Sequence, residues 1–300
     1  MAHKFGVVAL IGKPNVGKST LLNAMVGQKV AIVSDKPQTT RKRLLGIRST
    51  DASQIVFVDT PGVHEPHTRL GKTMLEAVRQ SLNDIDAVVW VVDGSKAPDE
   101  EDLRIVQMMA KTLEKPFLAS KGIVCLNKMD LLKAEFVVDH VERYCKLLGA
   151  ERYMMTTATR SLNIEKLVDL IEEMLPDGES MYPEDEFTDQ SSRFMAAELV
   201  REKILIATRR EVPHATGVTV DSWEEEGDLV RMSATIMVER AGQKAILIGR
   251  GGAFVKDIGT KARHEIELLI EKRVHLDLHV KVREDWRMNP GVLREMEYSE

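Results

Sequence analysis

A glycine-rich segment, residues 12–19, is the feature that most constrains how this chain can fold. It reads Gly-Lys-Pro-Asn-Val-Gly-Lys-Ser and lies between an apolar, β-branched run at residues 5–11 and a stretch with helical apolar spacing at residues 20–26. A strand, a glycine loop and a helix in this order are typical of a phosphate-binding loop. The glycines let successive backbone N–H groups point at an anion, and the following helix presents its positive dipole end to it. The segment therefore predicts a site for a nucleoside triphosphate.

Two side chains of this loop have the chemistry that the phosphates require. Lys18 adds a positive charge for the β- and γ-phosphates, and the hydroxyl of Ser19 is a suitable ligand for Mg²⁺. We expect contacts with the nucleotide from the whole loop and the residue after it, which are Gly12, Lys13, Pro14, Asn15, Val16, Gly17, Lys18, Ser19 and Thr20.

The polar and basic stretch at residues 29–45 has the mixed pattern of a mobile connection. A threonine here can complete the magnesium shell only while the γ-phosphate is present, which would make the stretch a switch. Thr39 and Thr40 are adjacent, so the residues alone leave the choice between them open. A simple solvated loop is the alternative for this stretch taken by itself.

The next buried strand, predicted at residues 55–58, ends in a D-x-x-G motif. Asp59 would lie at the carboxyl end of the strand, where a carboxylate can hold magnesium through a water molecule. Gly62 can bring its N–H up to the γ-phosphate because it has no Cβ. We expect nucleotide contacts from this motif and the residue after it, which are Asp59, Thr60, Pro61, Gly62 and Val63.

Val63 stands where Ras-like enzymes carry a glutamine that orients the attacking water. A valine side chain forms no hydrogen bonds, so we expect slow intrinsic hydrolysis. The side-chain oxygen of Asn15 suggests the hypothesis that a potassium ion near the phosphates supplies additional positive charge. His64 and His67 follow in the next loop and are assigned no catalytic role.

A second motif, at residues 127–130, identifies the base. Asp130 can accept hydrogen bonds from the N1–H and 2-amino groups of guanine, which adenine lacks. The amide of Asn127 can meet the acceptor edge of the purine, while the stem of Lys128 packs on the ring. Such a site rejects an analogue without the matching groups by roughly 10⁴ or more. The motif therefore predicts GTP, rather than ATP, as the ligand.

Strands alternate with helices through the first half of the chain. Further strands are predicted at residues 87–92 and 153–157, and a helix at about residues 162–175. This order favours an α/β domain with a mixed, mostly parallel six-stranded sheet and the ligand at the carboxyl ends of the strands. The backbone of Thr157 and Ala158, at the end of the last strand, would then touch the guanine carbonyl.

An acidic, proline-containing segment divides the chain. We expect a GTP-binding domain over residues 1–176, a solvated linker over residues 177–190 and a second domain over residues 191–300. Two domains are consistent with a length of 300 residues.

The second domain reads as an α-β-β-α-α-β pattern. Strands are predicted at residues 217–223, 229–238 and 275–282, and the two middle helices are joined by a G-x-x-G loop at residues 249–252. This loop in this position matches an α+β, type II KH domain, in which it clamps about four backbone nucleotides of single-stranded RNA. A purely structural role is the alternative.

Small and basic residues around that loop are the candidates for RNA contact. The small residues would let the sugar-phosphate backbone approach, and the basic ones would supply charge. Lys261 and Arg263 are also near in sequence, although some of these side chains must face away. The RNA-binding candidates are Lys244, Ile248, Gly249, Arg250, Gly251, Gly252 and Lys256.

Composition sets only loose limits on function. The formal net charge of −5 neither supports nor excludes a nucleic-acid partner. The first residues have no apolar signal-peptide region, and no run approaches the ~20 apolar residues of a membrane span. Cys125 and Cys145 have no metal-ligand spacing and suit small core positions in a reducing compartment. We therefore expect a cytoplasmic protein.

Taken together, the motifs resemble those of Era-type GTPases over nearly the whole chain. The phosphate-site motifs alone would fit many translation-factor-class GTPases, and the KH domain behind the linker makes the resemblance specific. The segments that carry it are residues 12–19, 38–41, 59–62, 127–130, 182–185, 201–203 and 248–252.

The resemblance implies a function. Proteins of this type bind near the 3′ end of small-subunit ribosomal RNA, assist maturation of the small ribosomal subunit and sometimes associate with the inner membrane. We expect a monomer that binds GTP, GDP and Mg²⁺ and hydrolyses GTP. The guanine motif that is usually Ser-Ala-x is Thr-Ala-Thr at residues 157–159 here, which preserves a backbone contact.

The resemblance also assigns roles at the phosphates. It favours Thr40 over Thr39 as the switch threonine, with Ser19, Thr40 and Asp59 holding Mg²⁺ and Lys18, Thr40 and Gly62 acting in catalysis. The rival interpretation is a GTP-gated signalling module, at a membrane or with a protein partner, in which the KH-like domain is a scaffold. A metabolic kinase is a poorer rival, because the motif at residues 127–130 would have no role in it.

Overall fold

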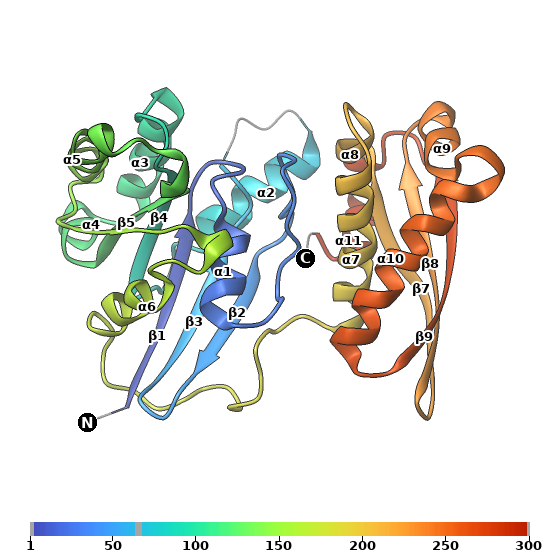
Figure 1. Ribbon diagram of the computed structural model, residues 1–300, viewed down its shortest axis with the longest axis horizontal. Helices are drawn as coiled ribbons and strands as arrows, with labels where there is room; N and C mark the ends of the chain where they lie inside the picture. Colours follow the sequence, from blue (N-terminus) through green and yellow to red (C-terminus); the bar gives the residue numbers. More distant parts are fainter. Residues whose placement is uncertain (1–2, 64–67, 299–300) are drawn as a thin grey trace. The chain divides into compact units, whose positions relative to one another are not determined.

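The computed structural model describes residues 3–63 and 68–298 of the chain (Figure 1). His64 and His67 lie outside these residues. Contacts between residues divide the described chain into two compact units. The first contains residues 3–31, 40–63 and 74–189, and the second contains residues 32–39, 68–73 and 190–298.

The first unit is built on a six-stranded sheet in the order β2-β3-β1-β4-β5-β6. Strands β2 and β3 pair antiparallel, and the other pairs are parallel. The prediction of a mixed, mostly parallel sheet is therefore confirmed. The strands are β1 (Lys4–Ile11), β2 (Leu44–Ser49), β3 (Ser53–Asp59), β4 (Ala87–Asp93), β5 (Gly122–Asn127) and β6 (Arg152–Met155).

Strand β2 begins inside the stretch that the sequence pattern predicts to be a loop. Its central Gly46 interrupts the apolar pattern, and the structure gives the reason. A Cβ at this position would lie 2.6 Å from Cδ1 of Leu22, so the strand needs a glycine to pack against the helix after the phosphate loop. The glycine in this strand is therefore explained by a contact with α1, which is distant in the sequence and which the local apolar periodicity cannot reveal.

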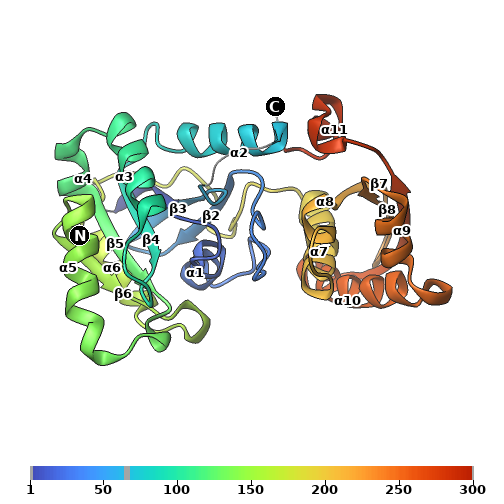
Figure 2. The same cartoon turned by 90° about the horizontal axis from the view of Figure 1, so that it is seen from above.

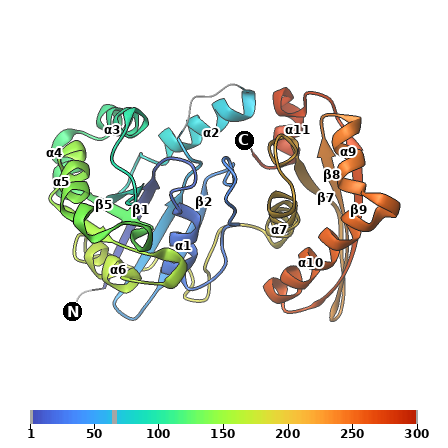
Figure 3. The ribbon, with the colours of Figure 1, turned by 45° about the horizontal axis from the view of Figure 1, so that its top comes forward.

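Helices cover both faces of this sheet, as expected for a doubly wound α/β domain. α1 and α6 contact each other on one face, as Figure 3 shows. On the other face, Trp90 of β4 packs with Met109 and Tyr144 from α3 and α5, and the Trp90 and Tyr144 rings meet edge to face at 5.5 Å. The helices are α1 (Lys18–Val26), α2 (Arg69–Gln80), α3 (Glu100–Thr112), α4 (Lys115–Lys121), α5 (Val137–Leu148) and α6 (Ile164–Glu172).

The acidic segment after α6 is not a free connector. Residues 177–189 belong to the first unit, and hydrogen bonds hold their backbone along its sheet. Gln54 Nε2 donates to the Tyr182 carbonyl at 2.8 Å, and the Ile47 N–H donates to the Phe187 carbonyl at 3.0 Å. The acidic side chains are mostly exposed, as expected, but the prediction of a solvated linker is wrong for the backbone. The partners are backbone groups of the edge strand β2 that face away from β3, and the side chain of Gln54 in β3.

The second unit contains the α-β-β-α-α-β order that the sequence predicts, with two short helices, α8 and α11, that it does not predict. Its sheet has the order β7-β8-β9, with β7–β8 antiparallel and β8–β9 parallel. α7 and α10 contact each other over one face of this sheet (Figure 2). The elements are α7 (Ser192–Ala207), α8 (Val212–Ala215), β7 (Gly217–Glu226), β8 (Leu229–Val238), α9 (Ala241–Ile248), α10 (Ala253–Ile270), β9 (Arg273–Val282) and α11 (Pro290–Glu295).

A segment from early in the chain is part of this second unit. Residues 32–39 precede Thr40, and Ile32 is 2% exposed in the same apolar cluster as Leu199, Ile204 and Ile266. The sequence pattern marks these residues as part of a mobile connection, but the structure packs them against α7. Within the described residues, no helix is long and apolar enough to cross a membrane.

Candidate functional site

The phosphate-binding loop follows β1 and leads into α1, as the sequence predicts. Close contacts require both of its glycines, and the backbone conformation also requires Gly17. Gly17 has a φ of +98°, and a Cβ there would lie 2.3 Å from Nδ2 of Asn127. At Gly12, a Cβ would lie 2.2 Å from the Val91 carbonyl oxygen. The two glycines therefore let the loop pack closely against Asn127 and the backbone of β4.

Lys18 is buried at the base of this loop. Its Nζ donates to the carbonyl oxygens of Gly12 at 3.0 Å and Lys13 at 2.9 Å. Burial lowers the pKa of Lys18 to about 8, against an opposing effect from the carboxylate of Asp59. The ammonium is thus held by the loop carbonyls beside the α1 N-terminus, which is where a β- or γ-phosphate would meet it.

Three predicted magnesium ligands converge in the first unit. Ser19 Oγ donates to Asp59 Oδ2 at 2.7 Å, and Thr40 Oγ1 lies 2.8 Å from Ser19 Oγ and 3.3 Å from Asp59 Oδ2. By contrast, Thr39 Oγ1 donates to the Lys36 carbonyl at 2.7 Å. Of the two adjacent threonines, Thr40 is therefore the one that joins the other oxygen donors.

The surroundings of Asp59 fit a hard cation. Asp59 is fully buried, and among the described residues its Oδ1 has no hydrogen-bond partner. Burial raises the pKa of Asp59, while Lys18 and the hydroxyls of Ser19 and Thr40 oppose this rise. A buried carboxylate with an orphaned oxygen and two convergent hydroxyls is a donor set that Mg²⁺ prefers.

The D-x-x-G motif lies directly against the phosphate loop. A Cβ on Gly62 would lie 2.7 Å from both N and Cα of Pro14, so a larger residue cannot occupy this position without a shift. The N–H of Val63 donates to the Gly12 carbonyl at 3.2 Å. The side chain of Val63 remains apolar and offers no group to orient a water molecule.

Asn127 joins three parts of the nucleotide site. Its Nδ2 donates to the Val16 carbonyl at 2.9 Å, and its Oδ1 accepts from the Ala158 N–H at 3.0 Å and from Thr156 Oγ1 at 3.2 Å. Only one N–H of the amide is used in this way, and Nδ2 carries a second one, so the contact of Asn127 with the purine stays a prediction. The N–H of Thr157 also pairs, with the Leu162 carbonyl at 3.3 Å, so a guanine contact at 157–158 would share a donor.

The other side chains of this motif remain near the surface. Lys128 has a φ of +61°, and its Nζ donates to Asp93 Oδ2 at 3.1 Å. The carboxylate of Asp130 is partly exposed, and its nearest cation is Arg160 at 3.7 Å. Among the described residues, Asp130 thus forms only this loose ion pair with the exposed Arg160, and its carboxylate retains its capacity to accept from a base.

The fold redirects the side chain of one predicted loop residue and leaves another residue of the loop exposed. The Nζ of Lys13 points to α3, where it donates to Asp99 at 2.8 Å and Asp102 at 2.7 Å. Because its side chain is held by α3, Lys13 can contact the nucleotide only through its backbone. Asn15 has a φ of +62° and is exposed at the tip of the loop.

A second candidate site lies at the G-x-x-G loop of the second unit. Gly249, Gly251 and Gly252 have φ values of +70°, +61° and +79°, which other residues rarely adopt. α10 begins at Ala253, directly after the loop. The exposed Arg250 lies within it, so backbone and charge are both available to a phosphate chain.

A cavity of about 250 Å³ in the second unit lies beside the first turns of α10. Helix α10 and strand β9 approach closely at Gly259, because a Cβ there would lie 3.3 Å from Cδ1 of Leu278. Lys244 and Lys261 do not line it, and Lys261 instead pairs with Asp257 at 2.7 Å. The lining residues are Val255, Lys256, Gly259, Thr260, Arg263, Leu276 and Leu278.

Sequence reasoning missed the apolar and small members of this lining. Gly259 and Thr260 follow the predicted Lys256 by three and four residues, which is the spacing of one helix face, so this spacing could have identified them. Leu276 and Leu278 alternate on β9, but only the tertiary structure shows that this strand forms the other wall.

Comparisons with known proteins agree with both sites. A family model described as a 50S ribosome-binding GTPase matches residues 7–128, and a KH-domain model matches residues 211–287. GTPase Era of Staphylococcus haemolyticus is 40% identical over 299 residues, which are 99% of this chain and 98% of that protein. GTPase Era of Heliobacterium modesticaldum is 42% identical over 297 residues, which are 98% and 97% of the two chains.

Solved structures show the same likeness. A crystal structure of Era in complex with MgGDPNP and nucleotides 1506–1542 of 16S ribosomal RNA has a TM-score of 0.94 and 38% identity, covering 99% of this chain and 100% of that one. A structure of a variant of Aquifex aeolicus Era bound to GDP·AlF4− has a TM-score of 0.93, 38% identity and the same coverage.

Proposed function

Because the chain belongs to the Era family of GTPases, we propose that it binds the 3′ region of small-subunit ribosomal RNA and assists maturation of the small ribosomal subunit. The chain is a GTPase with a KH domain. The observation that carries the proposal is the presence, in one chain, of a phosphate loop with its guanine motif and a G-x-x-G loop beside a basic, apolar cavity.

The second unit has the chemistry for single-stranded RNA. Left-handed glycines let a sugar-phosphate backbone approach the G-x-x-G loop closely. Lys256 and Arg263 supply positive charge along the cavity, and Leu276 and Leu278 supply an apolar wall against which bases can pack. This combination favours RNA binding over a scaffold role.

In the first unit, water attacks the γ-phosphorus and GTP becomes GDP and inorganic phosphate. Lys18 binds the β- and γ-phosphates, and the backbone N–H of Gly62 approaches the γ-phosphate. Ser19, Thr40 and Asp59 are the residues that would hold Mg²⁺, which when bound offsets the negative charge of the phosphates. Val63 leaves the water without a side-chain partner, so intrinsic hydrolysis is slow.

Asn15 supports a further proposal, that potassium assists hydrolysis. Its side chain lies at the exposed tip of the phosphate loop, where an oxygen ligand could hold a monovalent cation near the phosphates. Steady-state hydrolysis in equal concentrations of potassium and sodium tests this. A faster rate in potassium that Asn15→Ala abolishes supports the proposal, and equal rates contradict it.

The family resemblance also supports a monomer in the cytoplasm that associates peripherally with the inner face of the cell membrane. Sedimentation of the purified protein and its flotation with anionic lipid vesicles test the two parts. A dimer at micromolar concentration, or no flotation in either nucleotide state, would contradict them.

The decisive experiment measures RNA binding with a charge placed in the G-x-x-G loop. Gly252→Asp puts a carboxylate beside the proposed phosphate path, and Gly227→Asp makes the same change in the β7–β8 turn. The two glycines are matched, because both have positive φ and a Cβ on either would meet nothing within 4 Å.

We expect wild-type protein and Gly227→Asp to bind a short RNA from the 3′ end of small-subunit ribosomal RNA more tightly than a shuffled RNA. Gly252→Asp should weaken this binding about tenfold or more, because a like charge replaces an attractive contact. A wild-type protein that binds neither RNA would instead favour the GTP-gated signalling module.

A further inference from the structure

Two anchors hold the phosphate loop to other parts of the first unit. Toward its C-terminal end, the Val16 carbonyl accepts from Nδ2 of Asn127 at 2.9 Å. Toward its N-terminal end, Nζ of Lys13 reaches the first turn of α3, where it donates to Asp102 Oδ2 at 2.7 Å and to Asp99 Oδ2 at 2.8 Å. The loop and both anchors belong to the same compact unit. The second anchor uses a helix that carries none of the predicted nucleotide motifs.

Asp102 is a buried carboxylate whose charge needs an explanation. It is 0% exposed, its Oδ2 accepts from the Asp99 N–H at 3.0 Å, and among the described residues its Oδ1 has no hydrogen-bond partner. The bond from the Asp99 N–H completes the capping box of α3, but a neutral amide side chain can accept the same bond. Because burying an unpaired charge is costly, the charge of Asp102 points to the ammonium of Lys13 as its reason.

The ammonium of Lys13 is held in place by this pairing. Its side chain is only 12% exposed. Burial acts to lower the pKa of Lys13, but the hydrogen bonds from its ammonium to Asp102 and Asp99 outweigh burial and raise the pKa above the usual lysine value. Lys13 is therefore a charged side chain that is fixed at its far end by α3.

The backbone of Lys13 carries this anchor to the lysine of the phosphate site. The carbonyl oxygens of Lys13 and Gly12 accept from Nζ of Lys18 at 2.9 and 3.0 Å. The Gly12 carbonyl also accepts from the Val63 N–H at 3.2 Å, beside the D-x-x-G motif. A shift of Lys13 would therefore move the acceptors that place the Lys18 ammonium. In active sites, a displacement of about 1 Å can cost about 100-fold.

We propose that Asp102 is a positioning residue of the nucleotide site, which acts through the ammonium of Lys13 to hold the phosphate loop in the shape that places Lys18 at the β-phosphate. The inference rests on the proposed binding of the phosphates by this loop. It gives α3 a part in nucleotide binding, although no residue of α3 belongs to a nucleotide motif.

The sign of the effect distinguishes positioning from simple electrostatics. Asp102 is a negative charge close to a site for anions, so its removal should strengthen phosphate binding if charge alone matters. If Asp102 holds the loop, its removal should instead weaken phosphate binding, because the Lys13 backbone loses its anchor. The two accounts therefore predict opposite changes in affinity for the same variant.

The loss should also depend on which phosphates the nucleotide carries. GDP has a β-phosphate that Lys18 can meet, whereas GMP has the same base and sugar without it. Loss of positioning should therefore lower the ratio of GDP affinity to GMP affinity. A merely structural role for Asp102 would weaken the binding of both nucleotides alike and leave this ratio unchanged.

The test measures GDP and GMP binding by competition in full-length variants, with thermal melting as a check of folding. Asp102→Ala removes the carboxylate. Asp102→Asn removes only its charge and keeps an oxygen for the capping box, which makes it a milder variant if Asp102→Ala fails to fold. Lys13→Met removes the other partner and keeps a long apolar stem. The double variant Lys13→Met/Asp102→Ala shows whether the two residues act as one unit.

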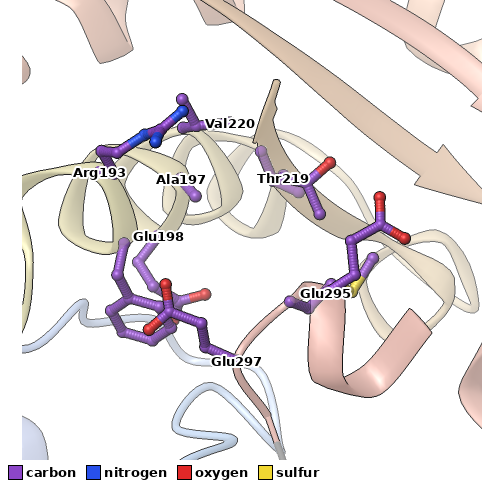
Figure 4. A pocket seen from close by; sticks show the side chains of 10 residues that line it. Arg193, Ala197, Glu198, Thr219, Val220, Glu295 and Glu297 are labelled. Carbon is purple, nitrogen blue, oxygen red and sulfur yellow. The ribbon is translucent and has the colours of Figure 1, made fainter. Parts of the chain in front are cut away.

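Glu198→Gln is the matched control for the loss of a buried carboxylate. Glu198 is 6% exposed, its Oε1 accepts from Nε of Arg201 at 2.7 Å, and both residues lie on α7 in the second unit. This variant removes a buried, paired negative charge without removing any partner of the phosphate loop. As Figure 4 shows, Glu198 lines a cavity of about 240 Å³ together with other residues that include Arg193, Glu295 and Glu297.

We expect Asp102→Ala to lower the ratio of GDP to GMP affinity about tenfold and Asp102→Asn to lower it about threefold, with Glu198→Gln unchanged within about twofold. The double variant should lose no more than Lys13→Met alone. An unchanged or raised ratio in the folded Asp102 variants, or losses that multiply in the double variant, would overturn the inference. A wild-type protein that binds GMP as tightly as GDP would overturn the proposed phosphate site itself, and this inference with it.

Discussion

The side-chain amide of Asn127 donates to the carbonyl of Val16 at 2.9 Å, and this hydrogen bond joins the guanine motif to the phosphate loop. The same side chain accepts from Ala158, so three loops at the carboxyl ends of β1, β5 and β6 share one buried hub. Gly17 completes the arrangement, because only a residue without a Cβ leaves room for the amide. The predicted binding sites for the base and for the phosphates are therefore held together by the same buried side chain, and a change at Asn127 should affect both.

Asn127→Ala should destabilise the nucleotide-free protein by about 2–4 kcal/mol, because it leaves the buried partners of the amide unpaired. Binding of GDP and of GTP analogues should weaken together. Thermal and urea unfolding without nucleotide would measure the first effect. Asp130→Ala is the control, since it removes a partly exposed base contact and should leave the unfolding free energy unchanged within about 0.5 kcal/mol. An unchanged unfolding midpoint for Asn127→Ala would contradict the role of the hub.

Asp130→Asn should change which base is accepted. A carboxylate accepts from the N1–H and 2-amino groups of guanine, whereas an amide can donate to the 2-carbonyl of xanthine. We expect GDP affinity to fall by about 100-fold or more and xanthosine diphosphate to become the better ligand. Competition binding with both diphosphates measures this, and retention of the GDP preference would show that another residue reads the base.

Thr40→Ala and Thr39→Ala should differ, although the residues are adjacent. Only the Thr40 hydroxyl joins Ser19 and Asp59, while the Thr39 hydroxyl bonds within its own loop. Thr40→Ala should slow single-turnover GTP hydrolysis about tenfold to 100-fold and leave GDP affinity unchanged. Thr39→Ala should hydrolyse GTP at close to the wild-type rate. The reverse order of the two variants would reassign the ligand.

Lys18 should make nucleotide binding dependent on pH. Burial lowers the pKa of Lys18 from 10.5 to about 8 in the nucleotide-free protein, and bound phosphates would raise it again. Binding should therefore take up about half a proton near pH 8 and more above it, so GDP affinity falls as the pH rises. Calorimetry in buffers of different ionisation enthalpy measures this uptake. No proton uptake at pH 8.5 would show that the side chain of Lys18 is already protonated in the nucleotide-free protein.

The lowered pKa of Lys18 also determines how the free energy of unfolding changes with pH. Between pH 8 and 10.5 the unfolded chain holds its Lys18 proton while the folded, nucleotide-free chain has lost it. The contribution of Lys18 to the free energy of unfolding therefore rises with pH across this window.

Lys256 and Lys261 provide a matched pair on α10 for testing the RNA groove. Lys256 lines the cavity beside the G-x-x-G loop, whereas Lys261 is paired with Asp257 outside it. Lys256→Ala should weaken RNA binding across sequences and reduce the slope of log affinity against log salt by about 0.7–1, while Lys261→Ala should change neither. Equal effects of the two variants would place the RNA elsewhere on the helix.

The sequence by itself determined the nucleotide chemistry and the order of the elements. The phosphate loop, Asp59 and the motif at residues 127–130 were recognisable because each directly follows an apolar strand, and parallel strands bring their carboxyl ends to one edge of the sheet. The G-x-x-G loop was recognisable in the same way, from the helices and strands around it.

Only the tertiary structure decided which groups these motifs meet. Residues 177–189 bind along the first sheet, β9 forms one wall of the RNA groove, and Ile32 packs in the same apolar cluster as Leu199. Each of these contacts joins residues far apart in the chain. Local spacing carries no information about such partners, because backbone hydrogen-bonding groups and apolar side chains can find partners in many folds. The residues alone therefore left the switch threonine as one of two, the family resemblance favoured Thr40, and long-range packing brings Thr40, and not Thr39, to Ser19 and Asp59.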